Sequence, residues 1–318
     1  MKSLFRVFVA LVAAAPLLAA AQGYPVKPVH VIVSTVPGPL DAFARIICDK
    51  ISADLKQPFV VENKAGAGGN IAAEYVKSQP ADGYTLLFAI DTTFTVNPGL
   101  YKKLPFDPEK DFATISMPVT YAQMLTVNPS VPVKTVNELV ALSKQKPLTY
   151  ASGGNGSPSH LAGAYFLSAA KTEMTHVPYK GTGQSVIDVI GGRVDTLFAV
   201  TAGVLQQVKG GKLKALAVSS PQRSALAPDV PTIAELGYPG FDVQFGYALM
   251  APAGTPDEVV QLLNREVNKA LKDPDVIEKN RIADYTPTFF DAKQSATWLR
   301  DNREKWTKVI QQQHITTE

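Results

Sequence analysis

Two loops rich in glycine and proline carry the residue types that could bind an anion. The first spans residues 36–41 and reads Val-Pro-Gly-Pro-Leu-Asp, and the second spans 152–158 and reads Ser-Gly-Gly-Asn-Gly-Ser-Pro. Each is predicted to leave the end of a strand and enter a helix. The first N–H groups of a helix lack partners inside it, and its dipole favours negative charge there. A carboxylate or phosphate is the expected guest, although the spacing equally fits two ordinary strand-to-helix connections.

The place of these loops in an α/β protein favours a shared site. Ser157 suits the capping position of the second helix, and Pro158 suits its first turn. In open α/β sheets ligands bind beyond the carboxyl ends of the strands, where such loops lie. Because the loops are far apart in sequence, they could belong to two lobes that close on one anion.

Other chemistries are weakly represented. The chain has four histidines and one cysteine, and none of them has a partner at metal-ligand spacing, so we expect neither a metal nor a cofactor. The motif Gly-x-Ser-x-Gly is missing. Residues 65–70 resemble half of a dinucleotide-binding fingerprint, but Ile71 replaces its third glycine. The alternative that stays open is a hydrolase using Ser157 or Ser159 with His160.

The elements that must position these loops follow a regular alternation. Short β-branched or aromatic runs alternate with helical patterns, which predicts mainly parallel sheets flanked by helices. Runs 115–127 and 242–251 are long and extended, and they could cross between two lobes. A last helix from about residue 291 carries both tryptophans on one apolar stripe, so we interpret them as core residues. The other predicted strands are 29–34, 59–62, 85–90, 148–151, 174–178, 194–198 and 215–219.

The first residues are predicted to be a targeting segment rather than part of the folded protein. Lys2 and Arg6 precede an apolar run, and small residues follow at 19–21, so residues 1–21 are predicted to be a cleaved signal peptide for export to the periplasm. Lysine and arginine number 31 and aspartate and glutamate 28. Because the signal takes two basic residues with it, the mature chain is nearly neutral, and no nucleic acid is expected as a partner.

Several segments resemble the Bug receptors, the solute-binding proteins of tripartite tricarboxylate transporters. The matching stretches keep the family order and cover nearly all of the mature chain. They include Val-Val-Glu-Asn-Lys-Ala-Gly-Ala-Gly-Gly-Asn-Ile at 60–71, His-Val-Pro-Tyr-Lys-Gly at 176–181, Ile-Gly-Gly-Arg-Val-Asp at 190–195 and Ala-Pro-Ala-Gly-Thr-Pro at 251–256. Each match alone is weak, but together they are specific.

The resemblance implies a type II periplasmic binding protein fold, with two α/β lobes around a ligand cleft. Lobe 1 is expected to comprise residues 22–121 plus 225–318, and lobe 2 residues 122–224. It also implies a monomeric receptor, not an enzyme, that captures a small organic carboxylate for sensing or for uptake through permease subunits in the membrane. The residues it implies at the carboxylate are Pro37, Gly38, Asp41, Ser152, Asn155, Gly156, Ser157 and His160.

Departures from the family pattern suggest a less polar pocket. The family usually has Pro-Gly-Gly-Gly-Thr-Asp in the first loop, whereas this chain has Pro39 and Leu40 within it. Asp91 and Thr92 replace a commoner Ser/Gly-rich segment, and Asp91 could repel a second carboxylate or accept from a hydroxyl. Asp195 matches a family aspartate and fits either a cleft residue or a turn-forming acid. We therefore expect an aromatic or apolar carboxylate, contacted by aromatic residues that could equally be core: Phe94, Tyr121, Phe245 and Tyr247.

Overall fold

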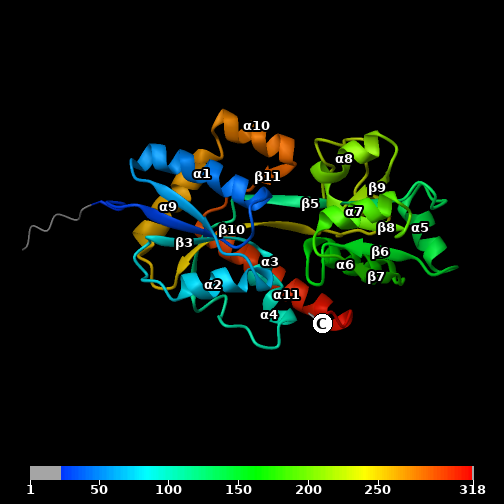
Figure 1. Ribbon diagram of the computed structural model, residues 1–318, viewed down its shortest axis with the longest axis horizontal. Coiled ribbons are helices and arrows are strands. Elements are labelled where there is room, and N and C mark those ends of the chain that lie inside the picture. Colours follow the sequence, from blue (N-terminus) through cyan, green and yellow to red (C-terminus); the bar gives the residue numbers. More distant parts are fainter. Residues whose placement is uncertain (1–22, 317–318) are drawn as a thin grey trace, which may run out of the picture.

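Two α/β lobes share one continuous path of hydrogen-bonded strands (Figure 1). The structure is a computed structural model, and it describes residues 23–316. The predicted signal peptide at 1–21 lies outside the described residues. Within 23–316, no helix has the length and apolar character needed to cross a bilayer.

The first lobe, at the left of Figure 1, contains the beginning of the described chain, and the last helix runs from it toward the second lobe. Its elements are β1 (Val29–Val33), α1 (Pro39–Leu55), β2 (Phe59–Asn63), η1 (Ala67–Gly69), α2 (Asn70–Lys77), β3 (Thr85–Ile90), α3 (Thr92–Thr95), α4 (Asn97–Leu100), β4 (Phe112–Ser116), α9 (Asp257–Ala270), α10 (Pro274–Ala283), β11 (Tyr285–Pro287) and α11 (Ala292–Gln312). Strands β2, β1 and β3 are parallel neighbours.

The second lobe, green in Figure 1, is built from the middle of the chain. Its elements are α5 (Val136–Ser143), β6 (Thr149–Ser152), α6 (Pro158–Ala170), β7 (Thr175–Pro178), α7 (Thr182–Ile190), β8 (Thr196–Val200), α8 (Thr201–Lys209), β9 (Lys214–Val218) and η2 (Ala234–Leu236). Strand β6 pairs in parallel with β7 and β8. The strands predicted in both lobes are confirmed to within a few residues.

Two long strands carry the chain between the lobes, as the two extended runs of the sequence predicted. The first half of β5 (Val119–Val127) pairs with β10 (Gln244–Pro252) and β11, and its second half pairs with β8 and β9. Beyond its own pairing with β5, β10 continues against β3 and β4 in the first lobe. A strand paired on both sides resists shear, so the lobes can move mainly by bending at these two crossings.

The sequence placed the return to the first lobe at residue 225, whereas the segment between β9 and β10 is bonded to the second lobe at both of its ends. Residue Val218 donates its N–H to Pro231, and the Val243 N–H donates to Ser219, so the intervening segment stays on the second lobe. Tyr238 packs against Phe166 of α6 there. We therefore propose the boundary at the start of β10 instead.

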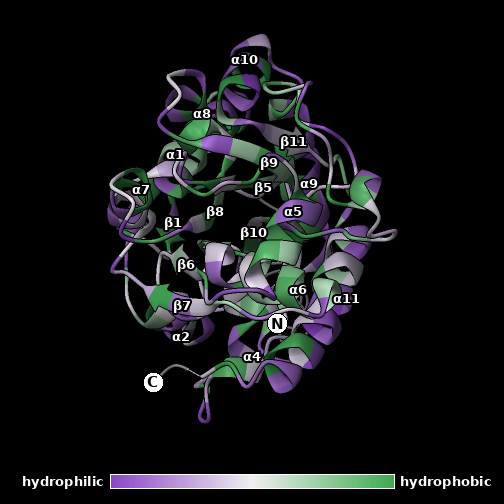
Figure 2. Cartoon of the chain, turned by 90° about the vertical axis from the view of Figure 1, so that its right-hand side faces the viewer, coloured by the Kyte–Doolittle hydropathy of each residue, from purple (hydrophilic) through white to green (hydrophobic). Residues whose placement is uncertain are grey.

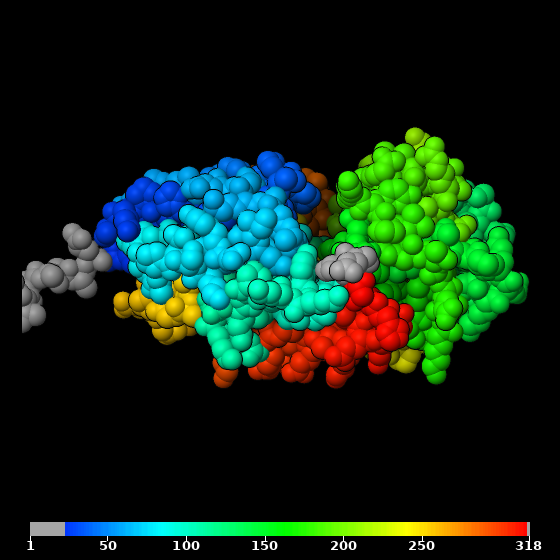
Figure 3. Space-filling view, turned by 60° about the horizontal axis from the view of Figure 1, so that its bottom comes forward, coloured from blue at the N-terminus to red at the C-terminus, as the bar shows by residue number. Residues whose placement is uncertain are grey.

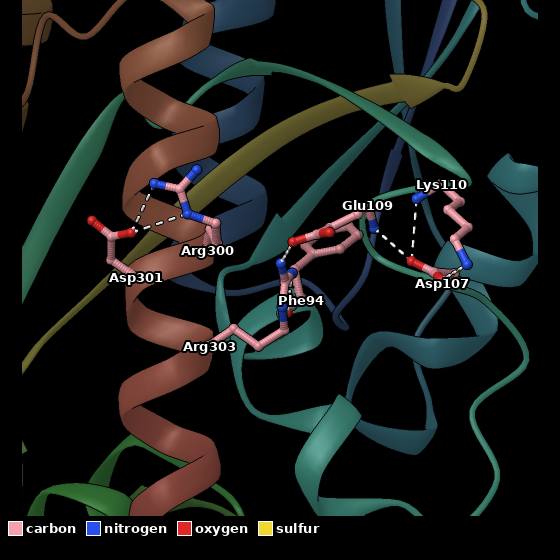
Figure 4. A network of polar contacts seen from close by, with 7 residues as sticks. All are labelled: Phe94, Asp107, Glu109, Lys110, Arg300, Asp301 and Arg303. Atoms are coloured by element: carbon pink, nitrogen blue, oxygen red, sulfur yellow. Dashed lines mark hydrogen bonds and ion pairs between the residues drawn. The ribbon is translucent and has the colours of Figure 1, made fainter.

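Helix α11 belongs to the first lobe but reaches the second. Arg303 donates to the carbonyl of Phe94 and pairs with Glu109, whereas Arg300 pairs with Asp301 on the helix itself (Figure 4). Toward its end, α11 contacts α6, and in Figure 3 its red C-terminal turns lie against the green lobe. Hydrophobic residues dominate α6, which is largely green and white in Figure 2, so this contact is mainly apolar.

Residue Trp306 is the centre of that contact. Its side chain is fully buried, stacks on Phe245 of β10 with ring centroids 5.4 Å apart, and meets the edge of Tyr165 of α6. Residue Trp298 is only partly buried, so the expectation that both tryptophans are core residues holds fully for Trp306 alone.

We predict that Trp306→Ala lowers the free energy of unfolding by about 3–5 kcal/mol, because truncating a buried aromatic side chain leaves a cavity. Urea denaturation followed by circular dichroism measures it. Trp298→Ala is the matched control, since the same truncation at a half-buried position should cost clearly less. Equal losses in the two variants would contradict the central role of Trp306.

Candidate functional site

Two adjoining cavities lie between the lobes. The larger has a volume of about 610 Å³ and the smaller about 340 Å³. Thr35, Val36, Ile90 and Pro158 line both, so the two form one continuous cleft. Val36 and Ile90 come from the first lobe and Pro158 from the second. The size of the cleft suits a small organic molecule enclosed by both lobes.

Four helices begin at the larger cavity. Its lining includes Gly38 and Pro39 at the start of α1, Ser159 in α6, Thr182 in α7 and Ala202 in α8. Each helix follows a strand, so all four N-termini lie at the carboxyl ends of β1, β6, β7 and β8. Helices α1, α7 and α8 begin without a side-chain cap from any described residue. The cleft therefore gathers the positive ends of four helix dipoles.

Backbone donors remain available at the two predicted loops. The first hydrogen bond within α1 runs from the Ala42 N–H to the Gly38 carbonyl, so the N–H groups of Leu40 and Asp41 precede it. In α6, the His160 N–H donates to the Ser157 hydroxyl, and Pro158 has no N–H. The described hydrogen bonds thus leave the Ser159 N–H as the free donor of that turn.

No charged side chain lines either cavity among the residues that the structure describes. An anion entering the cleft would find helix dipoles and N–H groups in place of a lysine or an arginine. Such a site suits one carboxylate well, because a helix N-terminus binds anions without a formal positive charge.

An aromatic wall forms the far side of the larger cavity. Tyr121 of β5, Tyr247 of β10 and Tyr285 of β11 line it, and their ring centroids lie 5.4–5.9 Å apart. The hydroxyls of Tyr247 and Tyr285 are 2.7 Å apart and share a hydrogen bond. Two of the four aromatic residues proposed from the sequence are therefore at the cleft, whereas Phe94 and Phe245 pack in the core. Sequence reasoning missed Tyr285.

The structure brings six of the predicted site residues to the cleft. In the smaller cavity, Gly156 has a φ of 72°, and a Cβ built there would lie 2.3 Å from the Leu100 side chain of the other lobe. Only glycine adopts this conformation easily and allows so close an approach. The six are Pro37 and Gly38 in the larger cavity, and Thr92, Asn155, Gly156 and Ser157 in the smaller one.

Three other predicted residues lie outside the cleft and bond to neighbouring parts of the fold. The Asp41 carboxylate accepts two hydrogen bonds from Arg45 one turn along α1, and these hold the pKa of Asp41 below its usual value. The Ser152 side chain is buried and bonds to Gly154 within the loop. The Asp195 carboxylate accepts from the Thr149 N–H and hydroxyl, at the strand ends away from the cleft.

The His160 ring faces a different cavity. It accepts the Gly156 N–H at Nδ1 and stacks on His176 with ring centroids 3.9 Å apart. Burial, with a smaller effect from His176, lowers the pKa of His160 to about 3. Neither Ser157 nor Ser159 is hydrogen-bonded to this ring among the contacts of the described residues, because the Ser157 hydroxyl accepts from the His160 backbone. The geometry gives no support to a hydrolase using Ser157 or Ser159 with His160.

Asp91 lies beneath the cleft rather than in it. Its side chain is fully buried, and it accepts from the Gly246 N–H on β10 at 2.9 Å and from the Thr95 hydroxyl at 3.1 Å. Burial raises the pKa of Asp91 to about 7, against the opposing effects of these hydrogen bonds and of the more distant Lys305. The carboxylate therefore ties the crossing strand to the first lobe.

Comparison with known proteins shows a family match over most of the chain. A family model described as the tripartite tricarboxylate transporter family receptor matches residues 43–315. The protein BugT of Bordetella pertussis is 34% identical over 296 residues, which cover 92% of this chain and 91% of BugT.

Solved structures show the same fold. A protein of R. palustris solved with adipate superposes with a TM-score of 0.81 at 31% identity, covering 92% of this chain and 99% of that one. The periplasmic binding protein BugD gives a TM-score of 0.77 at 30% identity, covering 92% of this chain and 99% of that one. The fold is thus the α/β fold of periplasmic binding proteins, as the sequence predicted.

We predict that Asp91→Asn removes a pH-dependent part of the stability. Between pH 3.8 and about 7 the unfolded chain releases this proton before the folded one does, so the contribution of Asp91 is fully present below that window and lost as the pH rises through it. Asparagine keeps an acceptor for the Gly246 N–H but does not titrate.

The measurement is urea denaturation of both proteins at several pH values from 4 to 8. The difference in unfolding free energy between variant and wild type should move in favour of the variant as the pH rises. Asp49→Asn, at an exposed position of α1, is the control and should show a smaller trend. A difference that stays constant across this range would refute the prediction.

Proposed function

The chain belongs to the tripartite tricarboxylate transporter receptor family, and from this we propose that it captures a small monocarboxylate with an aromatic or apolar body in the periplasm. The family consists of transport receptors rather than enzymes. Two similar proteins support capture of a carboxylate in the periplasm, though not the restriction to one carboxylate group: BugD is a periplasmic binding protein, and the R. palustris protein was solved with adipate, a dicarboxylate.

The observation that carries the proposal is the convergence of four helix N-termini on a cavity without charged side chains. The carboxylate group would bind at the turns around Gly38 and Ser159, where N–H groups from both lobes are available. Charge-assisted hydrogen bonds of this kind are roughly twice as strong as neutral ones. The apolar body would then lie against the wall of Tyr121, Tyr247 and Tyr285.

One carboxylate fits this cavity better than two. A second carboxylate at the aromatic wall would lose its water without meeting a cation, and burial of an unpaired charge is strongly unfavourable. Proline and leucine at positions 39 and 40 add apolar surface at the same end of the cleft. We therefore propose that aromatic and longer apolar acids bind more tightly than short tricarboxylates.

Closure of the lobes completes the site. The turn at Gly156 of the second lobe lies directly against Leu100 of the first, so the two lobes already meet at the smaller cavity. We propose that the closed, liganded form is what permease subunits in the membrane recognise. Direct delivery to a permease and signalling to a sensor both require only this change of shape.

Mass spectrometry of ligand retained by the freshly purified protein tests the proposal directly, followed by calorimetry with a panel of acids. We expect an aromatic or apolar monocarboxylate to bind more tightly than citrate, phosphate or sulfate. If no acid in the panel gives a heat of binding, the proposed function is wrong. If only inorganic anions bind, the protein is an oxyanion receptor instead.

We predict that Ala202→Asp raises the stability of the protein but lowers its affinity for the ligand. A carboxylate in the first turn of α8 should stabilise the helix by about 0.3–1 kcal/mol through the dipole. The same charge at the cavity wall should weaken binding of the acid by roughly tenfold or more. Thermal denaturation and calorimetry measure the two effects, and Ala202→Asn is the uncharged control. Unweakened binding by the Asp variant would show that the anion sits elsewhere.

We also predict that Gly156→Ala weakens binding through a clash with Leu100, and that adding Leu100→Ala restores part of the loss. The remaining loss reflects backbone strain at the positive φ, which costs about 1 kcal/mol. Gly211→Ala is the matched control, since Gly211 has a φ of 68° and open space around its Cβ position. It should lower stability similarly without changing affinity. Failure of Leu100→Ala to rescue would exclude the steric explanation.

A further inference from the structure

One buried polar side chain in the cleft lacks a hydrogen-bond partner among the described residues. The Gln123 side chain lines the larger cavity, is 2% exposed, and its Nε2 atom has no hydrogen-bond partner within residues 23–316. A buried donor without a partner costs about 1–3 kcal/mol, so its presence calls for an acceptor that arrives from outside the chain.

The position of Gln123 shows where that acceptor would lie. In β5, residues two apart point to the same face, so Gln123 stands next to Tyr121 of the aromatic wall. Its neighbour across the ladder is Val200, the residue before α8. The amide thus sits on the crossing strand, between the tyrosine wall and the start of α8.

Hydrogen bonds fix the backbone from which the Gln123 side chain extends. Its N–H donates to the Ser219 hydroxyl, its carbonyl accepts the Ser219 N–H, and the Ser219 hydroxyl donates to Val243. Residue Gln123 is therefore held where β5 passes from pairing with β10 to pairing with β8. Because the side chain is also buried, its amide loses less entropy on meeting a ligand than an exposed side chain would.

We propose that the Gln123 amide recognises an oxygen atom on the body of the ligand, away from its carboxylate. The ligand class is then an aromatic monocarboxylate that bears a neutral oxygen substituent, such as a phenolic hydroxyl or a ketone. This inference rests on the proposed function, and it adds to it the residue that distinguishes oxygenated from plain aromatic acids.

The absence of cations from the lining favours a neutral oxygen over a second carboxylate. Among the described lining residues, only uncharged groups surround Gln123. An amide N–H donor compensates a hydroxyl or ketone oxygen fully, whereas it satisfies only part of the hydration that a buried carboxylate loses. Plain aromatic acids leave the amide without a partner and bind more weakly for that reason.

The test is isothermal titration calorimetry on the full mature protein. Benzoate is compared with its three hydroxy isomers and with 4-acetylbenzoate, and cyclohexanecarboxylate reports on the aromatic wall. We expect at least one oxygenated acid to bind about 3- to 10-fold more tightly than benzoate, which corresponds to one hydrogen bond. This comparison within the wild-type protein needs no substitution.

Two substitutions then assign the preference to Gln123. In Gln123→Leu the ratio of affinities should fall to about one for every oxygenated acid. In Gln123→Glu the preference for 4-acetylbenzoate should be lost, because an ionised carboxylate has no N–H to donate to a ketone oxygen. Gln206→Leu, at an exposed position of α8, is the matched control and should keep the wild-type ratio.

The outcomes separate this inference from the proposed function. If aromatic acids bind but no oxygenated acid exceeds benzoate by threefold, or if the preference survives in Gln123→Leu, the role of Gln123 is wrong and the receptor function stands. If none of the acids binds, the role of Gln123 and the proposed function are both wrong.

Discussion

The cleft depends on one electrostatic arrangement, in which the positive ends of helices replace positively charged side chains. Helices α1, α6, α7 and α8 all begin at the larger cavity, and no charged side chain of the described residues lines it. The arrangement follows from the fold, because parallel strands bring the starts of their following helices to one edge of a sheet. Two such sheets facing each other double the number of helix ends at a single place.

Because helix starts from both lobes line the cleft, its geometry depends on both lobes and on the strands that connect them. The proposed carboxylate site is complete only when the Gly38 turn and the Ser157–Ser159 turn face each other, so their relative position must be reproducible. Strands β5 and β10 provide that, together with the Asp91 carboxylate that holds Gly246 on β10 and with Trp306 that joins α11 to β10 and α6. These residues never touch the cavity, yet they determine its shape.

Much of this could be predicted from the sequence, and the gaps have physical causes. The loops before α1 and α6 were found because glycine, proline and serine mark strand-to-helix turns strongly. The starts of α7 and α8 were missed, since a single Gly181 and the residue Val200 give weak signals. Tyr285 was missed because β11 has only three residues, and Asp91 was expected in the cleft because it follows β3 directly. Its side-chain direction depends on pairing with β10, which is remote in sequence.

An uncharged lining also bears on release, which a transport receptor needs as much as capture. A lysine or arginine in the cleft would be left buried and unpaired each time the ligand departed, and such a charge is costly to leave without a partner. Helix N-termini avoid this, because water can satisfy their N–H groups in the open cleft without any change in charge. In the proposed function, binding strength comes from enclosure of the carboxylate by turns of both lobes and from the tyrosine wall. Separation of the lobes would remove the first contribution, because the Gly38 and Ser159 turns belong to different lobes, and this loss would free the ligand.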